Sequence, residues 1–277
     1  MIILGDALQE LKRIESDSVD CVVTSPPYWR QRNYEAAGQI GQEKTFHEYL
    51  DSLLAVTLEL HRVIKETGTL FWVHGDGYGS ATGKQEPDKL SKKQNSIRGS
   101  ALVKSVGTSV VKGYNKSLLN LPHRLAIRMT DEQGWILRNN CIWHKPNAMP
   151  QPAIDRFVND YETVFFFVKR EKYFFKKMFE PYSNAKEYNP AGRGARAVWR
   201  IYTEGMSEDH PAAFPHSLVE RCIASGCPEG GIVLDPFLGS GTVGVVAERL
   251  GMNWIGIELS DKYGKIAKQR TRNQNLF

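Results

Sequence analysis

Seven short apolar runs are spaced along the chain and predict β-strands. They lie at 2–4, 19–24, 69–74, 136–143, 163–168, 231–234 and 254–257. Several are continuously apolar, which is the pattern of strands that are covered on both faces. The pattern therefore favours a sheet buried between two layers of other structure.

Two segments between these runs have the pattern of helices. Thr45 and Glu48 have the spacing of a capping box, and apolar residues follow at helical intervals as far as Gly68. A second helix is expected from Thr242 to Leu250, where Gly251 would end it. Strands that alternate with helices indicate an α/β fold with a doubly wound sheet.

Two long segments, 75–117 and 182–210, lack sustained periodicity. Between Lys84 and Lys116 the first has eight Lys or Arg residues against two acidic ones, a local net charge of +6 in a chain of net charge +5. Such a basic loop is either solvated or orders on a polyanion. The second is rich in Gly, Pro, Asn and Arg. We interpret 1–277 as a single domain with these two insertions.

Composition excludes several classes of protein. The chain has 277 residues, 41% of them hydrophobic, as in globular proteins, and no apolar run long enough for a membrane span. The N-terminus does not resemble a signal peptide, so we expect a cytoplasmic protein without membrane contact. The four cysteines fit neither a disulfide framework nor a zinc site and are expected to be buried in the core: Cys21, Cys141, Cys222 and Cys227.

The first motif with chemical meaning is Ser25-Pro26-Pro27-Tyr28. It directly follows the apolar run at 19–24 and therefore lies at the carboxyl end of a strand, where open α/β sheets build their sites. The two prolines remove backbone donors and fix two φ angles. This leaves a rigid turn in which the Ser25 hydroxyl and the Pro26 carbonyl can accept hydrogen bonds beside a flat aromatic ring. The alternative is a plain turn that closes the strand.

Such a turn suits the methylation of an aromatic amine. The amino lone pair of cytosine or adenine is delocalised into the ring, so the nitrogen is a poor nucleophile. Two acceptors that hold its N–H bonds would localise the lone pair as the nitrogen becomes pyramidal, an effect expressed mainly in the transition state. Neither a metal nor a covalent intermediate is needed.

The second motif is Asp235-Pro236-Phe237-Leu238-Gly239-Ser240-Gly241-Thr242, with Glu258 at the end of the following strand. The glycines allow close approach to a ligand, and the acid can bind two ribose hydroxyls. Gly239, Gly241 and Gly244 also satisfy the dinucleotide fingerprint. A nicotinamide enzyme ranks well behind, because a pyrophosphate loop usually follows its strand at once and the Ser-Pro-Pro-Tyr turn has no role in hydride transfer.

With both motifs the chain resembles the DNA amino-methyltransferases, in the permuted class whose catalytic tetrapeptide precedes the cofactor loop. The resemblance covers nearly the whole chain. It implies a Rossmann-like S-adenosylmethionine-dependent methyltransferase fold, with a mostly parallel seven-stranded sheet whose chain begins near its middle. It also implies S-adenosylmethionine as cofactor, no metal, and double-stranded DNA with the target base flipped out onto Tyr28. A homodimer, a cognate restriction endonuclease and a prokaryotic or viral host cell are in keeping with it.

The resemblance assigns catalytic and cofactor-binding residues, and the basic residues of the two insertions add candidate contacts with DNA. The catalytic residues are Ser25, Pro26, Pro27 and Tyr28. The cofactor-binding residues are Asp6, Thr24, His210, Pro211, Phe214, Asp235, Pro236, Phe237, Gly239, Ser240, Gly241, Thr242 and Glu258. Contacts with DNA are expected from Trp29, Lys92, Lys93, Arg98, Lys145, Arg193 and Arg196. The last two lie in the insertion at 182–210, a candidate target-recognition region.

The first residue of the tetrapeptide favours a target base. Family members with Ser there mostly methylate N4 of cytosine, and those with Asp mostly N6 of adenine, so we predict cytosine N4 with adenine N6 as the alternative. Carbon 5 of cytosine is disfavoured because the chain has no Pro-Cys nucleophile. An RNA base, a protein glutamine amide and a DNA-binding module without catalysis are more distant alternatives. Whether the methylated amine loses its proton to Ser25 or to solvent is left open.

Overall fold

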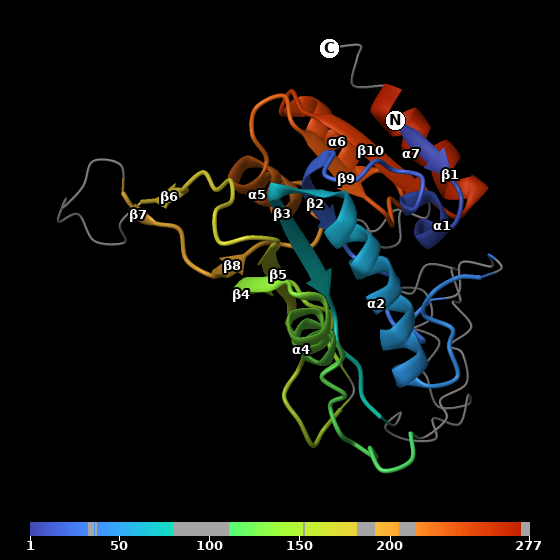
Figure 1. Ribbon diagram of the computed structural model, residues 1–277. Helices are drawn as coiled ribbons and strands as arrows, with labels where there is room; N and C mark the ends of the chain where they lie inside the picture. Colours follow the sequence, from blue (N-terminus) through green and yellow to red (C-terminus); the bar gives the residue numbers. More distant parts are fainter. Residues whose placement is uncertain are drawn as a thin grey trace.

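The computed structural model describes residues 1–32, 36, 38–79, 111–151, 153–181, 192–204 and 214–272. Within them, one sheet runs through the molecule with helices on both faces (Figure 1). Most of the first insertion and part of the second lie outside these residues.

The sheet of the described residues has eight strands and is mostly parallel. In spatial order they are β1 (Ile2–Leu4), β10 (Asn253–Glu258), β9 (Ile232–Asp235), β2 (Val19–Thr24), β3 (Ile64–His74), β5 (Tyr161–Val168), β4 (Ile136–His144) and β8 (Val198–Arg200). The first five are parallel, β5 is antiparallel to both neighbours, and β8 is parallel to β4. All seven predicted strands are present, and the predicted α/β class is confirmed. A separate pair, β6 (Phe179–Glu180) and β7 (Arg193–Gly194), is antiparallel.

The sheet differs from the sequence prediction in two respects. The eighth strand, β8, lies within the predicted insertion at 182–210 and has only three residues, of which Trp199 alone is buried. So short a strand leaves no periodic signal in the sequence. The chain begins at an edge of the sheet and not near its middle, since β1 pairs with β10 only. The two ends of the chain meet at this edge, because Ile3 lies opposite Ile257.

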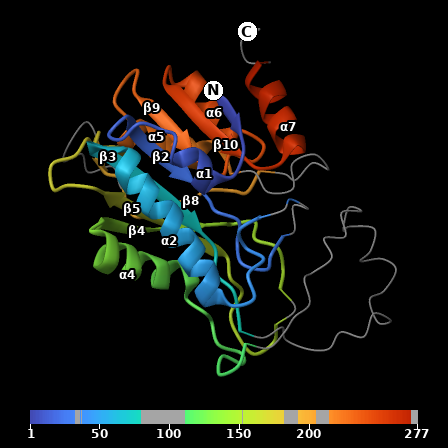
Figure 2. The same ribbon diagram turned by 45° about the vertical axis from the view of Figure 1, so that its right-hand side comes forward.

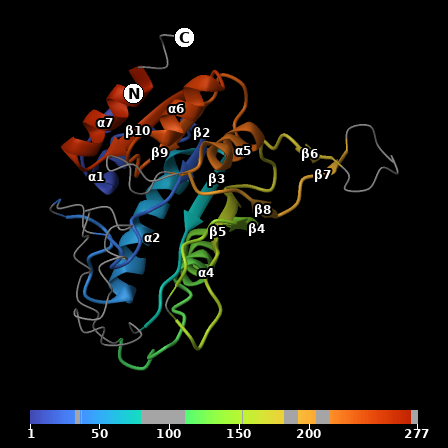
Figure 3. The same ribbon diagram turned by 180° about the vertical axis from the view of Figure 1, so that it is seen from behind.

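Helices cover both faces of the sheet. One face carries α1 (Ala7–Leu11), α2 (Phe46–Val63) and α4 (Leu121–Gln133), as Figures 1 and 2 show. The other face carries α5 (His216–Gly226) and α6 (Thr242–Arg249), with α7 (Asp261–Arg272) beside α6 and β1 (Figure 3). Strand β2 serves both layers, because successive side chains of a strand point to opposite faces. Val22 packs in one core, Cys21 and Val23 in the other.

The free cysteines lie in the core, as the sequence predicted. All four are buried and unpaired. Burial raises the pKa of the Cys141 thiol to about 11 and that of Cys227 to about 12. These thiols are therefore core residues and not nucleophiles.

No helix in the described part of the chain combines the length and the apolar character that a membrane crossing requires.

The start of α2 was predicted correctly and its end was not. Thr45 Oγ1 accepts from the Glu48 amide at 3.2 Å, and the Glu48 carboxylate accepts from the Thr45 amide at 2.9 Å, so the capping box is present. The helix ends at Val63, before the predicted Gly68. Ile64 turns to extended backbone (φ −68°, ψ 135°) and pairs with Val19 in the sheet. A buried strand partner overrides the helical pattern there.

Removing the cap should lower stability without touching the site. Thr45→Ala is expected to reduce the free energy of unfolding by about 1 kcal/mol, because the Glu48 amide loses its acceptor. Urea unfolding measures the change. Thr45→Ser, which keeps the hydroxyl, is the matched control. An unchanged midpoint for Thr45→Ala would show that the cap is not stabilising.

Candidate active site

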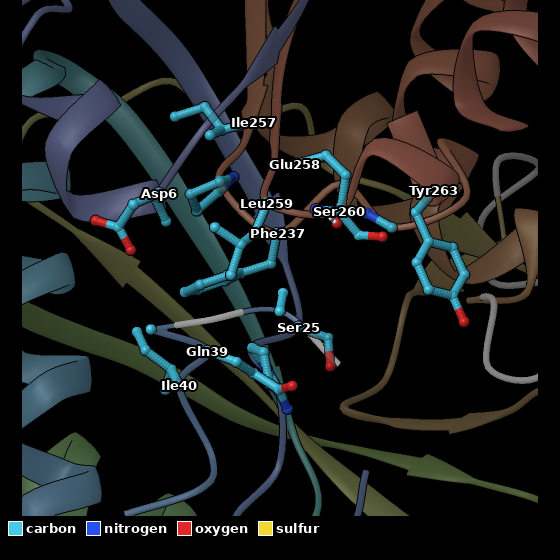
Figure 4. Close-up of a pocket in the computed structure, with 16 residues that line it drawn as sticks. Asp6, Ser25, Gln39, Ile40, Phe237, Ile257, Glu258, Leu259, Ser260 and Tyr263 are labelled. Carbon is cyan, nitrogen blue, oxygen red and sulfur yellow. Dashed lines mark hydrogen bonds between the residues drawn. The ribbon is translucent and has the colours of Figure 1, made fainter. Parts of the chain in front are cut away.

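A pocket lies at the carboxyl ends of four parallel strands. Asp6 follows β1, Ser25 follows β2, Pro236 follows β9 and Leu259 follows β10, and all four residues line it. It holds about 650 Å³, counting the part open to solvent, which is in the range of small-molecule sites. Figure 4 shows Asp6 and Tyr263 at opposite ends, with Ser25 between them. This is where an open α/β sheet is expected to bind a ligand.

The glycine-rich loop after β9 fixes one carboxylate of this pocket. The amide of Gly239 donates to one oxygen of Glu258 at 2.8 Å, and the amide of Ser260 donates to the other at 2.7 Å. Gly239 and Gly241 both have positive φ, 55° and 88°, and a Cβ on Gly241 would lie 2.9 Å from Ala267. Burial raises the pKa of Glu258, although hydrogen bonds from the backbone amides of Ser260, Gly239 and Leu259 act in the opposite direction. The loop therefore presents an oriented acceptor to the pocket.

Ten of the thirteen predicted cofactor residues divide into two groups, those that line the pocket and those that lie behind it. Five of them line the pocket: Asp6, Pro236, Phe237, Gly239 and Glu258. Five others lie behind it: Thr24, Asp235, Ser240, Gly241 and Thr242. Phe214 packs half-buried against the core of the α5 and α6 face. His210 and Pro211 lie outside the described residues.

The residues behind the pocket hold its walls together. Thr24 Oγ1 donates to Asp235 at 2.7 Å, and the Phe237 amide donates to the same carboxylate oxygen at 3.0 Å. These bonds join the end of β2 to the cofactor loop. On the far side of the loop, Arg270 donates to both the carbonyl and the hydroxyl of Ser240. Because these residues do not line the pocket, they act by positioning the residues that do.

The buried Asp235 should make stability depend on pH. Burial raises its pKa from 3.8 to about 7, so between these values the native state holds a proton that the unfolded chain releases. The free energy of unfolding should therefore fall as pH rises, by at most about 1.4 kcal/mol per pH unit from this group. Asp235→Asn stays neutral and keeps an acceptor oxygen, so its unfolding should depend less on pH. Denaturant titrations at pH 5 and pH 7 compare the two, and equal slopes would contradict this assignment.

The turn Ser25-Pro26-Pro27-Tyr28, which the sequence predicts to be catalytic, forms the wall of the pocket opposite Glu258. Ser25 and Pro27 line the pocket, while Pro26 is buried. The Ser25 hydroxyl lies 3.0 Å from the Tyr28 hydroxyl, which donates to Glu162 at 2.8 Å. Burial, and then the charge of Glu162, raises the pKa of Tyr28 well above its ordinary value. Its hydroxyl therefore keeps its proton.

A second set of bonds holds the backbone of this turn. Burial lowers the pKa of His74 to about 3, so its ring is neutral. Trp72 Nε1 donates to His74 Nδ1 at 3.4 Å, which makes Nε2 the protonated nitrogen. Nε2 lies 2.9 Å from the Tyr49 hydroxyl, which donates to the Pro27 carbonyl at 3.0 Å. The hydrogen bonds therefore run in one direction, from Trp72 through His74 and Tyr49 to the Pro27 carbonyl of the turn.

The ring of Tyr28 packs closely against His74 and Gly75. It stacks on His74, with the ring centroids 5.4 Å apart. A Cβ on Gly75 would come within 2.7 Å of the Tyr28 ring, so the glycine leaves the room that the ring occupies.

The residues expected to contact DNA differ in burial and in their contacts with the rest of the protein. Lys92, Lys93 and Arg98 lie outside the described residues. Trp29 is a core residue, 8% exposed, whose indole donates to the Glu43 carbonyl. Lys145 forms an ion pair with Glu162 and lies over the ring of Trp143. Arg193 is half-buried beside Glu180, whereas Arg196 is exposed.

Sequence reasoning missed several residues of the site. Glu162, Tyr49 and His74 reach the catalytic turn from other strands and helices. Tyr263, Gln39 and Ile40 line the pocket from segments without a motif. Among the described residues, no three His, Cys, Asp or Glu side chains are grouped as metal ligands are.

Comparison with known proteins identifies the family. A sequence model described as DNA methylase, the N6/N4 family, matches residues 19–269. The chain belongs to the N6/N4 DNA methylase family. It is 40% identical over 275 residues to the type II methyltransferase M.XycI of Xanthomonas campestris pv. cyanopsidis, covering 98% of this chain and 87% of that one. It is 37% identical to M.SmaI of Serratia marcescens, covering 97% and 89%. It is therefore a type II DNA methyltransferase that depends on S-adenosylmethionine.

Solved structures share the fold of this DNA methylase. The PvuII DNA methyltransferase, described as cytosine-N4-specific, superposes with a TM-score of 0.70 at 24% identity and covers 98% of this chain and 85% of that one. The protein TTHA0409 of Thermus thermophilus, solved as a complex with S-adenosyl-L-methionine, has a TM-score of 0.64 at 24% identity, covering 99% and 95%. At these identities they support the fold alone.

The pocket of this DNA methylase fits its cofactor. Glu258 offers a fixed acceptor for ribose hydroxyls, and Phe237, Ile257 and Ile40 supply an apolar lining suited to a purine ring. Ser25 lines the same pocket as Glu258 and Phe237, so the predicted catalytic turn and the predicted cofactor residues face one space.

Proposed function

We propose that this DNA methylase transfers a methyl group to N4 of cytosine in duplex DNA, with the target base flipped out of the helix. The observation that carries the proposal is the position of Ser25, which begins the catalytic turn and lines the pocket opposite Glu258. The choice of cytosine over adenine rests on Ser25 as the first residue of the turn; the PvuII enzyme, which has the same fold, is described as cytosine-N4-specific.

The residues of the turn have distinct tasks. S-adenosylmethionine, bound against Glu258 and Phe237, supplies an activated methyl group. The Ser25 hydroxyl and the Pro26 carbonyl accept the two N–H bonds of the target amine, which localises its lone pair. Tyr28 offers its ring for stacking and replaces neighbours that the base loses on leaving the duplex. Tyr49 holds the backbone of the turn through Pro27.

Features around the turn support a DNA substrate. The loop between β4 and β5 begins at Lys145 and ends near Glu162, and its tip exposes Ile154 fully and Phe157 to 97%. We propose that this loop and the insertions 75–117 and 182–210 face the DNA, with Arg196 among the contacts. In the chain Ser25 follows β2, whereas the cofactor loop follows β9, an order that supports the permuted class.

The choice of base can be tested without knowing the recognition sequence. Genomic DNA copied with N6-methyl-dATP has no free adenine amine, and DNA copied with N4-methyl-dCTP has no free cytosine amine. Labelled S-adenosylmethionine should transfer its methyl group to the first DNA and not to the second. The reverse pattern would favour adenine N6, and transfer only to RNA or protein added to the reaction would contradict the proposal.

A further inference from the structure

The hydroxyl of Ser25 can serve the reaction in only one of its two roles. A hydroxyl has one donor proton and two acceptor lone pairs. If Ser25 accepts an N–H of the target amine, it draws the nitrogen lone pair out of the base ring. If it donates its own proton to that nitrogen, it occupies the lone pair that has to attack. The direction of the Ser25 O–H bond therefore decides whether the turn promotes or inhibits attack of the target amine on the methyl group.

A row of hydrogen bonds, which runs from Ser25 through Tyr28 to Glu162, fixes the direction of the Ser25 O–H bond. An ionised carboxylate can only accept, so the Tyr28 hydroxyl, 2.8 Å from Glu162 Oε2, has to donate its single proton there. The Tyr28 oxygen is then an acceptor for the Ser25 hydroxyl at 3.0 Å. The Ser25 oxygen is left with only lone pairs to offer the base. Burial keeps the Tyr28 proton in place by raising its pKa.

Lys145 binds Glu162 at the end of the row away from Ser25. Its ammonium donates to the other carboxylate oxygen, Glu162 Oε1, and lies 4.3 Å from the centroid of the Trp143 ring. An ammonium has no acceptor, so it can never reverse the polarity of the row. The Lys145 and Glu162 side chains are 18% and 16% exposed, so water competes little for these bonds.

We infer that Glu162 is a positioning residue: through Tyr28 it orients the Ser25 hydroxyl so that the oxygen accepts from the target amine. The inference rests on the proposed role of the turn in amine methylation, and it applies to cytosine N4 and adenine N6 alike. Glu162 does not line the pocket and reaches Ser25 only through Tyr28, so it is expected to act on the rate of transfer and not on cofactor or DNA affinity.

The test is Glu162→Gln, which keeps the shape but adds an amide that can donate to Tyr28 and reverse the row. Single-turnover methylation of duplex DNA should slow by about 100-fold, the loss typical of a misplaced transition-state hydrogen bond. The Kd values for S-adenosylmethionine and for DNA should not change. The matched control is Glu171→Gln, an exposed carboxylate just past the opposite end of β5 from Glu162 and outside the row; it should methylate at the wild-type rate.

A second variant separates orientation from folding. Tyr28→Phe keeps the ring and removes the hydroxyl, so Ser25 loses its acceptor and the rate should again fall. Because Glu162 acts through Tyr28, the double variant should be no slower than Tyr28→Phe alone. Full additivity of the two losses, or a normal rate for Glu162→Gln, would overturn the inference. A loss that comes entirely from weaker cofactor or DNA binding would also overturn it.

The outcome is distinguishable from a failure of the proposed function. If the wild type methylates adenine, the choice of cytosine is wrong, while the rate ratio of Glu162→Gln to wild type still decides the role of Glu162. If the wild type transfers no methyl group to DNA, both the proposed function and the inference are contradicted.

Discussion

Ser25→Ala is expected to lower the rate constant of methyl transfer by roughly 100-fold or more, the usual cost of removing one transition-state hydrogen bond. The variant loses one of the two acceptors for the target amine, and the Pro26 carbonyl remains. S-adenosylmethionine should bind with unchanged Kd, because the cofactor wall around Glu258 does not depend on this hydroxyl. Single-turnover assays with labelled cofactor, combined with calorimetric binding, measure the two quantities separately.

Ser18→Ala is a suitable control for that measurement. Ser18 is a partly buried serine at the other end of β2, and its hydroxyl donates to the Glu15 carbonyl far from the pocket. It should leave methyl transfer unchanged. A Ser25→Ala enzyme that transfers methyl groups at the wild-type rate would remove Ser25 from the chemistry.

Glu258→Ala should weaken S-adenosylmethionine binding by about 100-fold, since a hydrogen bond to a charged group contributes roughly 1.5–3 kcal/mol. The carboxylate is the acceptor that the Gly239 and Ser260 amides fix in the pocket. Its removal takes away both the acceptor and the bonds that shape the loop. Isothermal calorimetry gives the Kd, and unchanged affinity would exclude Glu258 as a cofactor residue.

The same residue predicts how cofactor binding depends on pH. Burial raises the pKa of Glu258 above its ordinary value, so the carboxylate takes up a proton at a higher pH than an exposed glutamate does. Protonation removes acceptor capacity, and affinity for S-adenosylmethionine should fall as the pH is lowered. Glu258→Gln, which cannot ionise, should bind weakly at every pH without this slope.

The sequence was sufficient to locate seven of the eight strands in the described sheet, because a run of apolar residues marks a strand that is buried on both faces. Strands such as β2 and β9, covered by helices on either side, have mostly apolar sequences that identify them. Strand β8 and the end of α2 were not predictable in this way. Both depend on pairing with a distant strand: Val198 pairs with β4, and Ile64 pairs with β2. The local sequence carries no information about which strand will be the partner.

The site was predictable where its residues form short motifs. Ser25 and Glu258 were found because each ends an apolar strand, and both line the pocket. Glu162 was not found, because it lies 134 residues from Tyr28 and only the pairing of strands brings it near. Asp235 was placed in the cofactor group by its motif. Its contacts with Thr24 and Phe237 show that it supports the wall from behind.

The identity of the methylated nucleoside tests the central claim most directly. Unmodified duplex DNA is incubated with labelled S-adenosylmethionine and the protein, digested to nucleosides and analysed by mass, with Ser25→Ala in parallel. The account predicts that wild-type protein yields 4-methylcytosine and that Ser25→Ala yields almost none. 6-Methyladenine would contradict the choice of base, and 4-methylcytosine formed equally by both proteins would contradict the role of Ser25.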